Sequence, residues 1–368
     1  LSSERYKEVG VVDSNYEQIR LDEICKIYQP QTISKKEMIP DGKYNVFGAN
    51  GIIGKYSKYN HEESEVLVTC RGATCGTINF SNPKCWITGN AMVVTPLNDR
   101  LTKSYLFHLL KNMNLNSTIS GSAQPQITRN PLSSFVIPVP PLSIQEEIVA
   151  EIKGYQKIID GARQVVDNYK PTIKINPDWE MVSLGQLCDL FGGGTPSRSN
   201  DSFWTDGTIK WLSAKHIDSE GKIPSHELIT EDAIKGSSSK VAPMGSIIVV
   251  SRVSVGKVAF ADDNYAINQD LTAFIPKDEN ELNNKFLFYM IRMKADYMDE
   301  NAQGLGVRGV RRDFLSKMEI PLPSLSRQQE IVSQIKAEQE MVNSNKKLIE
   351  IYEQKIKDKI AEVWGDNS

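Results

Sequence analysis

The stretch IPVPPLSIQEEIV, residues 137–149, reappears as IPLPSLSRQQEIV at residues 320–332. Nine of the thirteen positions are identical, at an offset of 183 residues. Self-similarity at so long a period indicates a duplicated domain, because solenoid repeats recur every ~20–50 residues. Each copy therefore ends in the same proline-rich segment, which we call the strap (residues 137–141 and 320–324).

The duplication extends far upstream of the strap. Residues 16–21 align with residues 179–184 at an offset of 163, and residues 66–71 align with residues 247–252 at an offset of 181. The growing offset predicts about twenty extra residues in the second copy, most of them between its opening motif and its central strand.

Each copy has the same coarse order of elements. A short amphipathic segment precedes a turn-rich region, apolar strands bounded by glycine, a helix, a polar loop, and a last strand before the strap. Strands with scattered helices in this order predict two tandem, similar α+β domains.

A helical hydrophobic period follows each strap. Ile148, Ile152 and Ile159 recur at helical spacing in the first copy, as do Ile331 and Ile335 in the second. Such a stripe fits a helix packed onto its parent domain, and it also fits two long helices packed together. The second interpretation is favoured because both segments leave their domains at equivalent points and run for about 28 residues or more.

The start of each long helix has a predicted cap. Ser143 and Ser326 are the expected N-caps, because Glu146 and Gln329 follow them at the capping-box spacing.

Composition excludes several classes of protein. The chain of 368 residues is 40% hydrophobic, and it has no run of eighteen apolar residues, so no transmembrane helix is expected. Its start, Leu1–Arg5, is polar and gives no signal peptide, which predicts a cytoplasmic protein with reduced cysteines. The chain also lacks an initiator Met, which predicts either a processed end or a piece cut from a longer polypeptide. The net charge of −3 gives no global signature of nucleic-acid binding, so any such binding rests on local patches.

No catalytic constellation is apparent in the sequence. The four histidines show no triad arrangement. The run Asn130-Pro131-Leu132-Ser133 lacks the second proline and the aromatic residue of an adenine methyltransferase motif. Cys70, Cys75 and Cys85 lack the paired spacing of a zinc site. We therefore expect no metal, no cofactor and no enzymatic activity in this chain.

Several motifs resemble one family. Residues 193–198 read GGTPSR, residues 209–211 read IKW and residues 266–270 read AINQD, while residues 44–51 of the first copy read YNVFGANG. Their order, together with the duplicated strap, resembles the specificity (S) subunit of Type I restriction–modification systems over nearly the whole chain.

The resemblance implies a division of the chain into four parts. These are a target recognition domain (residues 1–140), a central spacer helix (141–173), a second target recognition domain (174–323) and a C-terminal spacer helix (324–368). Each target recognition domain would read one half of a bipartite DNA sequence, and the helices would form an antiparallel pair that acts as a ruler. A helix of about 28 residues is about 42 Å long, which equals about twelve base pairs at ~3.4 Å each.

The resemblance also implies partners. Double-stranded DNA and two methyltransferase subunits docked on the helices are expected, and the family admits a restriction or translocase subunit. Adenine methylation would belong to the methyltransferase subunits. The two copies differ most in their turn-rich regions, so the half-sites should differ, and a palindromic site is not expected.

The candidate DNA contacts are basic, amide and hydroxyl side chains in polar loops. Arginine and glutamine suit guanine and adenine edges, and hydroxyls suit phosphate. No acidic residue lies between Asn301 and Arg312, so this stretch is the strongest local basic patch. Each candidate also has a structural interpretation as part of a solvated loop, a turn or an ion pair. The predicted set is Arg71, Ser122, Gln124, Gln126, Arg129, Thr195, Ser197, Arg198, Lys215, Arg252, Asn268, Gln269, Arg308, Arg311 and Arg312.

Two other functions remain open from the sequence. The chain fits the C-terminal specificity region of a single-chain restriction–methylation enzyme, and an upstream reading frame fused in frame would identify it. It also fits a duplicated protein-binding scaffold without a DNA role, which salt-dependent retention on DNA would exclude.

Overall fold

The computed structural model describes residues 16–48, 50–121, 125–304 and 306–365. The chain forms two compact units. Unit 1 comprises residues 1–167 and 344–368, and unit 2 comprises residues 168–343.

Unit 1 contains a four-stranded antiparallel sheet in the order β2-β8-β5-β6, a three-stranded sheet in the order β4-β3-β7, and two short strand pairs, β1 with β11 and β9 with β10. Its strands are β1 (Gln18–Arg20), β2 (Cys25–Tyr28), β3 (Tyr44–Gly48), β4 (Gly51–Tyr56), β5 (Val66–Thr69), β6 (Ile78–Phe80), β7 (Trp86–Ile87), β8 (Ala91–Pro96), β9 (Ile119–Ser120), β10 (Gln126–Ile127) and β11 (Val136–Pro138). Its helices are α1 (Leu21–Ile24), α2 (Lys103–Lys111), α3 (Arg129–Ser133) and α4 (Leu142–Asn168), with short 3-10 turns at Lys35–Glu37 and Asn116–Thr118.

Unit 2 repeats this plan with a larger second sheet. Its sheets have the orders β13-β20-β17-β18 and β15-β14-β19-β16, beside the pair β12 with β21. Its strands are β12 (Glu180–Ser183), β13 (Cys188–Gly192), β14 (Ile209–Leu212), β15 (Glu227–Ile229), β16 (Lys240–Ala242), β17 (Ile247–Val250), β18 (Val258–Phe260), β19 (Tyr265–Ile267), β20 (Leu271–Pro276) and β21 (Glu319–Leu322). Its helices are α5 (Leu184–Leu187), α6 (Glu231–Lys235), α7 (Asn284–Arg292), α8 (Ala295–Glu300), α9 (Arg312–Lys317) and α10 (Leu325–Trp364), with 3-10 turns at Asp201–Phe203 and Ala214–His216.

The predicted class of two similar α+β domains is confirmed. The central strands β5 and β17 read VLVT and IIVV, and every residue in them is buried. A strand covered on both faces loses the alternating polar pattern and becomes continuously apolar. In both units a parallel contact joins the second sheet, β3 to β7 and β14 to β19. β15 takes the place of β4 beside the parallel pair, and the extra length of the second copy forms β16, α6 and a longer connection between β14 and β15.

Each strap is joined to its unit by a buried glutamine. The Gln145 side chain is fully buried, and its Nε2 donates hydrogen bonds to Arg100 O at 2.7 Å and Pro140 O at 2.8 Å. Its Oε1 accepts from Thr102 N at 2.9 Å. Gln145 thus connects the first turn of α4 to the start of α2.

Gln328 forms the same joint in unit 2. Its Nε2 donates to Glu281 O and Pro323 O, both at 2.9 Å, and its Oε1 accepts from Asn283 N at 2.8 Å. Both glutamines satisfy backbone groups that burial would otherwise leave unpaired.

The predicted N-caps of the long helices are wrong. Helices α4 and α10 begin at Leu142 and Leu325, so Ser143 and Ser326 lie within the first turn. At α10 the hydroxyl of Ser324 accepts from Arg327 N at 3.4 Å, so the capping serine lies two residues earlier than expected. The local spacing of serine and glutamate did not reveal the actual position because the strap proline and the buried glutamine set the helix start.

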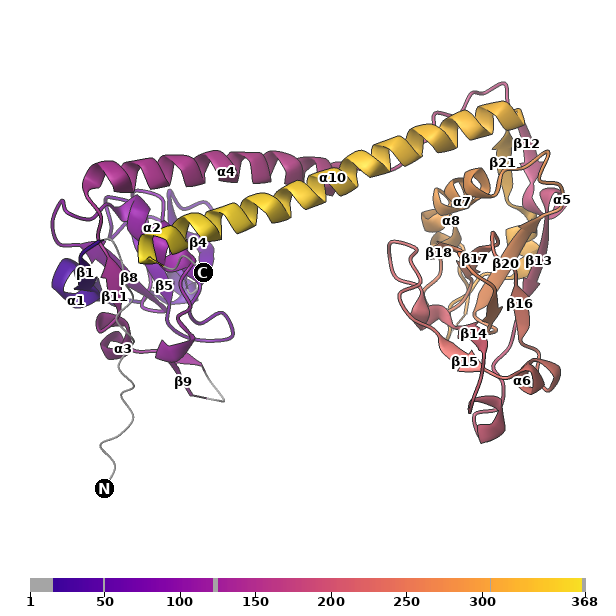
Figure 1. The fold of residues 1–368 in the computed structure, drawn as a ribbon, viewed down its shortest axis with the longest axis horizontal. Coiled ribbons are helices and arrows are strands. Elements are labelled where there is room, and N and C mark those ends of the chain that lie inside the picture. The colour runs from indigo at the N-terminus through magenta and orange to yellow at the C-terminus, as the bar shows by residue number, and fades with distance from the viewer. Residues whose placement is uncertain (1–15, 49, 122–124, 305, 366–368) are drawn as a thin grey trace. The chain divides into compact units, whose positions relative to one another are not determined.

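Both interpretations of the helical stripe hold, for successive parts of α4. Ile148 and Ile152 belong to the core of unit 1. Further along, the rings of Tyr155 and Tyr352 lie 5.3 Å apart. Ion pairs join Glu151 to Lys359 and Arg163 to Glu353. Contacts near the start of α4 involve late residues of α10, so the two helices run antiparallel within unit 1 (Figure 1).

The first part of α10 packs in unit 2. Ile331 and Ile335 belong to the core of unit 2, together with Ile173 from the segment after α4. The hydroxyl of Tyr169 donates to Glu338 at 3.3 Å. A single helix of 40 residues therefore contributes to both units. No helix in the described part of the chain is long and apolar enough to cross a membrane.

Candidate nucleic-acid interface

The same edge of the four-stranded sheet gathers polar loops in both units. In unit 1 the end of β5 meets the start of β8, with Thr69 paired to Ala91, and in unit 2 Val250 pairs with Leu271. The residues just outside these pairs are Arg71 and Asn90 in unit 1, and Arg252 and Asp270 in unit 2. We call these regions the unit-1 edge and the unit-2 edge.

Equivalent backbone hydrogen bonds build the two edges. Cys70 N donates to Asn90 O at 3.2 Å, as Ser251 N donates to Asp270 O at 2.8 Å. The polar loop that precedes α3 or α9 then joins the strand end. Ile127 N donates to Cys70 O at 3.1 Å, and Val310 N donates to Ser251 O at 2.8 Å.

This loop contact places the two predicted site regions of each copy side by side. Arg71 forms an isolated antiparallel bridge with Gln126, and Arg252 forms one with Gly309. Residues separated by more than fifty positions in sequence are therefore neighbours at each edge.

The unit-2 edge carries four exposed arginines. The Arg252 guanidinium lies 3.8 Å from the Asp270 carboxylate. Arg308 donates to Asp299 O at 2.6 Å and lies 3.6 Å from the Asp299 carboxylate. Arg311 and Arg312 form no ion pair within the described residues, and the Arg312 guanidinium lies beside Gly192 at the end of β13. The edge thus has more positive charge than its acidic neighbours neutralise.

Hydroxyl and amide groups complete this edge. Thr195 Oγ1 donates to Gln269 Oε1 at 2.8 Å, and both residues are exposed. Asn268 is buried and holds the turn itself, because its Nδ2 donates to Asp270 Oδ2 at 2.8 Å and its Oδ1 accepts from Asp270 N at 3.0 Å. Asn268 therefore supports the edge from beneath.

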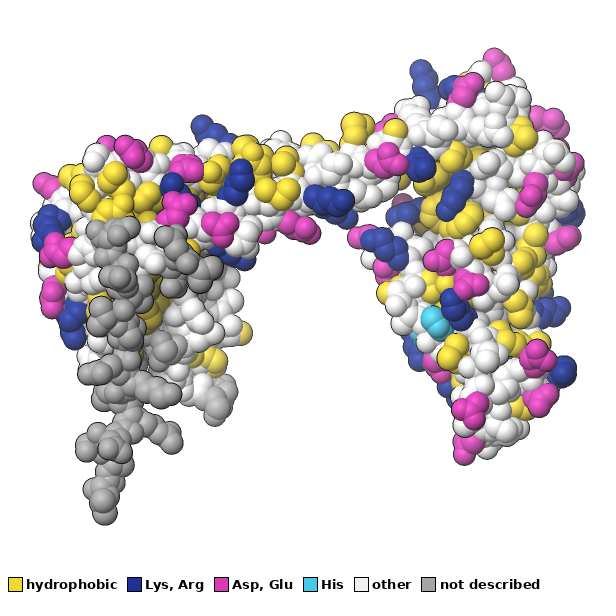
Figure 2. Space-filling view, in the orientation of Figure 1, with side chains coloured by type: hydrophobic (Ala, Val, Ile, Leu, Met, Phe, Trp, Pro, Cys, Tyr) yellow, Lys and Arg dark blue, Asp and Glu magenta, His cyan; other side chains and the backbone are white. Residues whose placement is uncertain are grey.

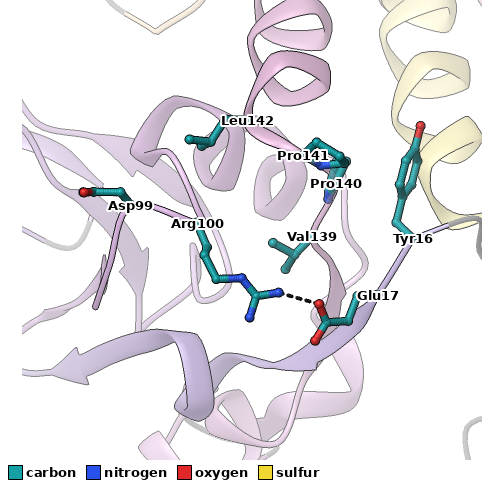
Figure 3. A pocket seen from close by; sticks show the side chains of 8 residues that line it. All are labelled: Tyr16, Glu17, Asp99, Arg100, Val139, Pro140, Pro141 and Leu142. Atoms are coloured by element: carbon teal, nitrogen blue, oxygen red, sulfur yellow. Dashed lines mark hydrogen bonds and ion pairs between the residues drawn. The ribbon is translucent and has the colours of Figure 1, made fainter.

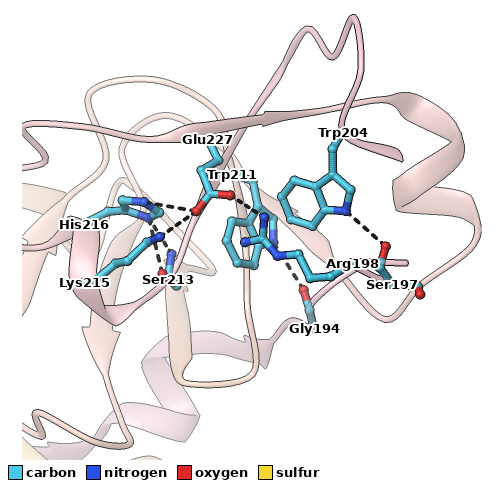
Figure 4. Close-up of polar contacts among 9 residues, drawn as sticks. All are labelled: Gly194, Ser197, Arg198, Trp204, Trp211, Ser213, Lys215, His216 and Glu227. Carbon is cyan, nitrogen blue, oxygen red and sulfur yellow. Dashed lines mark hydrogen bonds and ion pairs between the residues drawn. The ribbon is translucent and has the colours of Figure 1, made fainter. Parts of the chain in front are cut away.

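Arg198 and Lys215 belong to a separate group of side chains around Glu227, which we call the cation cluster (Figure 4). The Arg198 guanidinium stacks over Trp204, with its Cζ 3.6 Å from the ring centre, and donates to Glu227 at 2.6 Å. Trp204 in turn donates to Ser197 O at 3.1 Å. The tryptophan anchors a loop and holds the arginine flat.

Lys215 and His216 approach the same carboxylate. The Lys215 Nζ lies 2.8 Å and the His216 Nε2 lies 3.7 Å from Glu227 Oε1. The hydrogen bond from Arg198, reinforced by Lys215, lowers the pKa of Glu227 to about 2. Burial lowers the pKa of His216, so this imidazole stays neutral at pH 7. Two cations share one carboxylate, which leaves one positive charge in the cluster.

The unit-1 edge is less basic. Arg71 and Arg129 are exposed, and neither forms an ion pair within the described residues. Arg129 is the first residue of α3, as Arg312 is of α9. Gln126 and Asn90 present exposed amides at this edge. The predicted contacts Ser122 and Gln124 lie outside the described residues.

The sequence did not single out the hairpin of β3 and β4 as part of this edge. Thr88 N donates to Phe47 O at 3.0 Å, which places the end of β3 beside the turn that joins β7 to β8. Ile52 and Ile53 follow the turn at Asn50-Gly51 and are 58% and 47% exposed. The Asn-Gly pair is a hairpin signal, but only the strand pairing reveals which edge the hairpin joins.

An open groove of about 720 Å³ lies beside the strap of unit 1 (Figure 3). Val139, Pro140, Pro141 and Leu142 line one part of it, and an ion pair between Arg100 and Glu17 crosses another. The described residues contain no group of three metal-ligating side chains.

The family model for the Type I restriction modification DNA specificity domain matches residues 13–165 and 176–353. The two matches fall on the two copies of the duplication, and the chain belongs to this family.

Individual relatives agree with the family. The Type I restriction enzyme MjaIX specificity subunit of Methanocaldococcus jannaschii is 30% identical over 185 residues, which are 49% of this chain and 42% of that subunit. The chain thus spans less than half the length of this relative. A putative type I restriction enzyme specificity subunit of Haemophilus influenzae is 25% identical over 351 residues, covering 88% of both chains.

The fold also matches a solved structure. The S subunit of a Type I restriction-modification system from M. genitalium aligns over 97% of this chain and 98% of its own, with a TM-score of 0.55 and 12% identity. At this identity the likeness concerns the fold alone.

Proposed function

We propose that this chain reads an asymmetric, bipartite, gapped DNA site for a restriction–modification system. Unit 1 reads one half-site and unit 2 reads the other. The chain positions methyltransferase subunits, two in number, which methylate adenine. It acts in the cytoplasm on double-stranded DNA and performs no catalysis itself.

One observation carries this proposal. The two edges share their backbone hydrogen bonds but differ in the side chains that they expose, with Arg71, Asn90 and Gln126 in unit 1 and Arg252, Gln269 and Arg308 in unit 2. A fixed frame with variable side chains is what sequence discrimination needs, because base edges are distinguished by their patterns of donors and acceptors.

The proposed contacts fall into two kinds. Phosphates are bound by cations and hydroxyls, and base edges are read by forked or amide side chains. The phosphate contacts are Arg129, Ser122, Thr195, Ser197, Arg198, Lys215, Arg311 and Arg312. The base contacts are Arg71, Gln124, Gln126, Arg252, Gln269 and Arg308, while Asn268 supports the unit-2 edge without touching DNA.

The long helices set the spacing and present a surface to the partners. Helix α4 has 27 residues and is about 40 Å long, equal to about twelve base pairs of DNA. Exposed hydrophobic side chains lie among charged ones along the helices (Figure 2). In unit 1 they are Leu142, Ile158, Val165, Leu348 and Ile351. Exposed apolar side chains on a helix pair support docking of the methyltransferase subunits and of a restriction or translocase subunit.

Two alternatives have distinct signatures. If the chain is part of a single-chain restriction–methylation enzyme, its methyltransferase is fused upstream and the same edges read the DNA. If the chain is a protein-binding scaffold, the basic unit-2 edge has no role and the chain with its partner does not bind DNA. The four arginines of the unit-2 edge favour a DNA role over the scaffold.

Coexpression of the chain with its methyltransferase, followed by mapping of methyladenine across the host genome, tests the proposal. A single gapped motif with two different halves is expected. Copurification of the two proteins without any methylated motif would contradict it.

A further inference from the structure

The turn after the central strand begins in the same way in both units, but with a different residue. In unit 1 Gly72 follows Arg71, and in unit 2 Val253 follows Arg252. Both residues have positive φ angles, 92° for Gly72 and 73° for Val253. Gly72 N donates to Pro125 O at 3.1 Å, and Val253 N donates to Arg308 O at 3.0 Å.

The left-handed backbone suits glycine and strains valine. Glycine has no Cβ and adopts positive φ freely, whereas a β-branched side chain there clashes with its own backbone. Among the described residues, Lys84 and Asp206 are the other non-glycine residues with positive φ, and neither is β-branched. A hydrogen bond of 3.0 Å from Ser254 N to Arg252 O closes the turn tightly around Val253.

The valine side chain gains no burial that would offset this strain. It is 63% exposed, and Val307, one residue before Arg308, is 51% exposed. Both are apolar side chains at an edge that otherwise exposes arginine, hydroxyl and amide side chains. A strained, exposed residue that the surrounding structure holds in place indicates a role in binding.

We infer that Val253 determines specificity by contacting the C5-methyl group of a thymine in the half-site of unit 2. This inference rests on the proposed DNA-reading function. The thymine methyl is the apolar group that DNA displays in its major groove, and short apolar side chains contact it. Wedges that unstack bases are mostly longer, such as phenylalanine or leucine. Val307 covers the other side of the methyl group, and Arg252 and Arg308 hold the flanking DNA.

The test compares thymine with deoxyuridine, which lacks only the methyl group. Once the methylated motif is known, each thymine of both half-sites is replaced singly by deoxyuridine, and duplexes are titrated with the chain in complex with its methyltransferase. At one position of the unit-2 half-site, the wild-type complex binds the deoxyuridine duplex about fourfold more weakly than the thymine duplex, as expected for one buried methyl-sized group. The Val253→Gly complex loses most of this preference for thymine at that position, and Val307 accounts for what remains.

Thermal stability gives a second measurement: Val253→Gly is expected to weaken thymine recognition but to stabilise unit 2. Val253→Gly restores the residue found in unit 1, so the unfolding transition of unit 2 is expected to rise by about 2–4 °C. The matched variant Gly72→Val introduces the strain into unit 1 and lowers its transition. A fall in the Val253→Gly transition would overturn the strain argument.

The unit-1 half-site is the internal control for binding. Replacing thymine by deoxyuridine in the unit-1 half-site is expected to change the affinity of the wild-type and Val253→Gly complexes by the same factor. The inference is overturned if the wild-type complex tolerates deoxyuridine at every position of the unit-2 half-site, or if Val253→Gly keeps the discrimination. Such a result leaves the proposed function intact, whereas absence of any sequence-specific binding by the wild-type complex would refute the function itself.

Discussion

The unit-1 edge and the unit-2 edge have one backbone plan and two chemistries. Arg71 and Arg252 follow equivalent strands, yet the neighbouring acceptor is Asn90 in unit 1 and Asp270 in unit 2. The unit-2 edge adds Arg308 and Arg311, for which the loop of unit 1 has no arginine counterpart before Arg129. The difference shows that the hydrogen bonds of the frame involve the main chain, so side chains at the edge can change without loss of the fold. Unit 2 is therefore expected to dominate electrostatic affinity, and unit 1 to rely on amide contacts.

The largest expected effect concerns the joints, where the two units should not differ. Gln145→Leu and Gln328→Leu each leave three backbone groups without partners, one of them buried and two part-buried, so each is expected to destabilise its own unit by about 3 kcal/mol. Denaturant unfolding of the two variants measures the loss. Gln329→Leu, an exposed neighbour, is the control and should change little. If only one of the two glutamine variants loses stability, the two joints are not equivalent.

The next effect separates the edges by charge. Replacing Arg311 and Arg312 together with alanine should lower the slope of log affinity against log salt by about two, because two phosphate contacts are lost. The weakening should track the unit-2 half-site, and duplexes that contain only one correct half-site can show this. Lys317→Ala, at the other end of α9, serves as the control. An unchanged slope would remove both arginines from the interface.

A smaller and more local effect is expected in unit 1. Gln126→Ala should relax discrimination at one base pair of the unit-1 half-site by about 1 kcal/mol, and the salt slope should stay the same. Methylation of a library of sites randomised in that half measures the change. If Gln126→Ala reduces methylation of all sequences equally, Gln126 contacts the DNA backbone and the division of roles between the edges is wrong.

The smallest effect at neutral pH involves the cation cluster of unit 2. Because the pKa of Glu227 is lowered to about 2 in the folded state, its contribution to stability is present above pH ~4.5 and is lost as the pH falls toward 2. Wild-type unit 2 should therefore lose more stability than Glu227→Gln over this range. Acid titration followed by tryptophan fluorescence reports it, since Arg198 stacks on Trp204. Parallel acid curves for the two proteins would exclude this linkage.

The sequence revealed the features that depend on local or repeated patterns. The duplicated strap, the two α+β domains and the helical stripe follow from spacing, which hydrophobic burial imposes on strands and helices alike. The role of Gln145 could not be predicted, because its partners Arg100 and Thr102 are more than forty residues away.

The chemistry of the edges was harder to predict for the same reason. Arg198 resembled a free phosphate ligand in a glycine-rich turn, but Glu227 and Trp204 reach it from other segments. The positive φ of Val253 shows in the sequence only through alignment with Gly72, and a single residue pair does not identify a strained turn.

The central claim is that each unit reads its own half-site. The most direct measurement is a methyladenine map for a chimera in which residues 1–140 are replaced by the corresponding copy of a relative, compared with the map for the wild-type chain. The account predicts that one half of the gapped motif changes while the other half and the gap length persist. A chimera that alters both halves would contradict it.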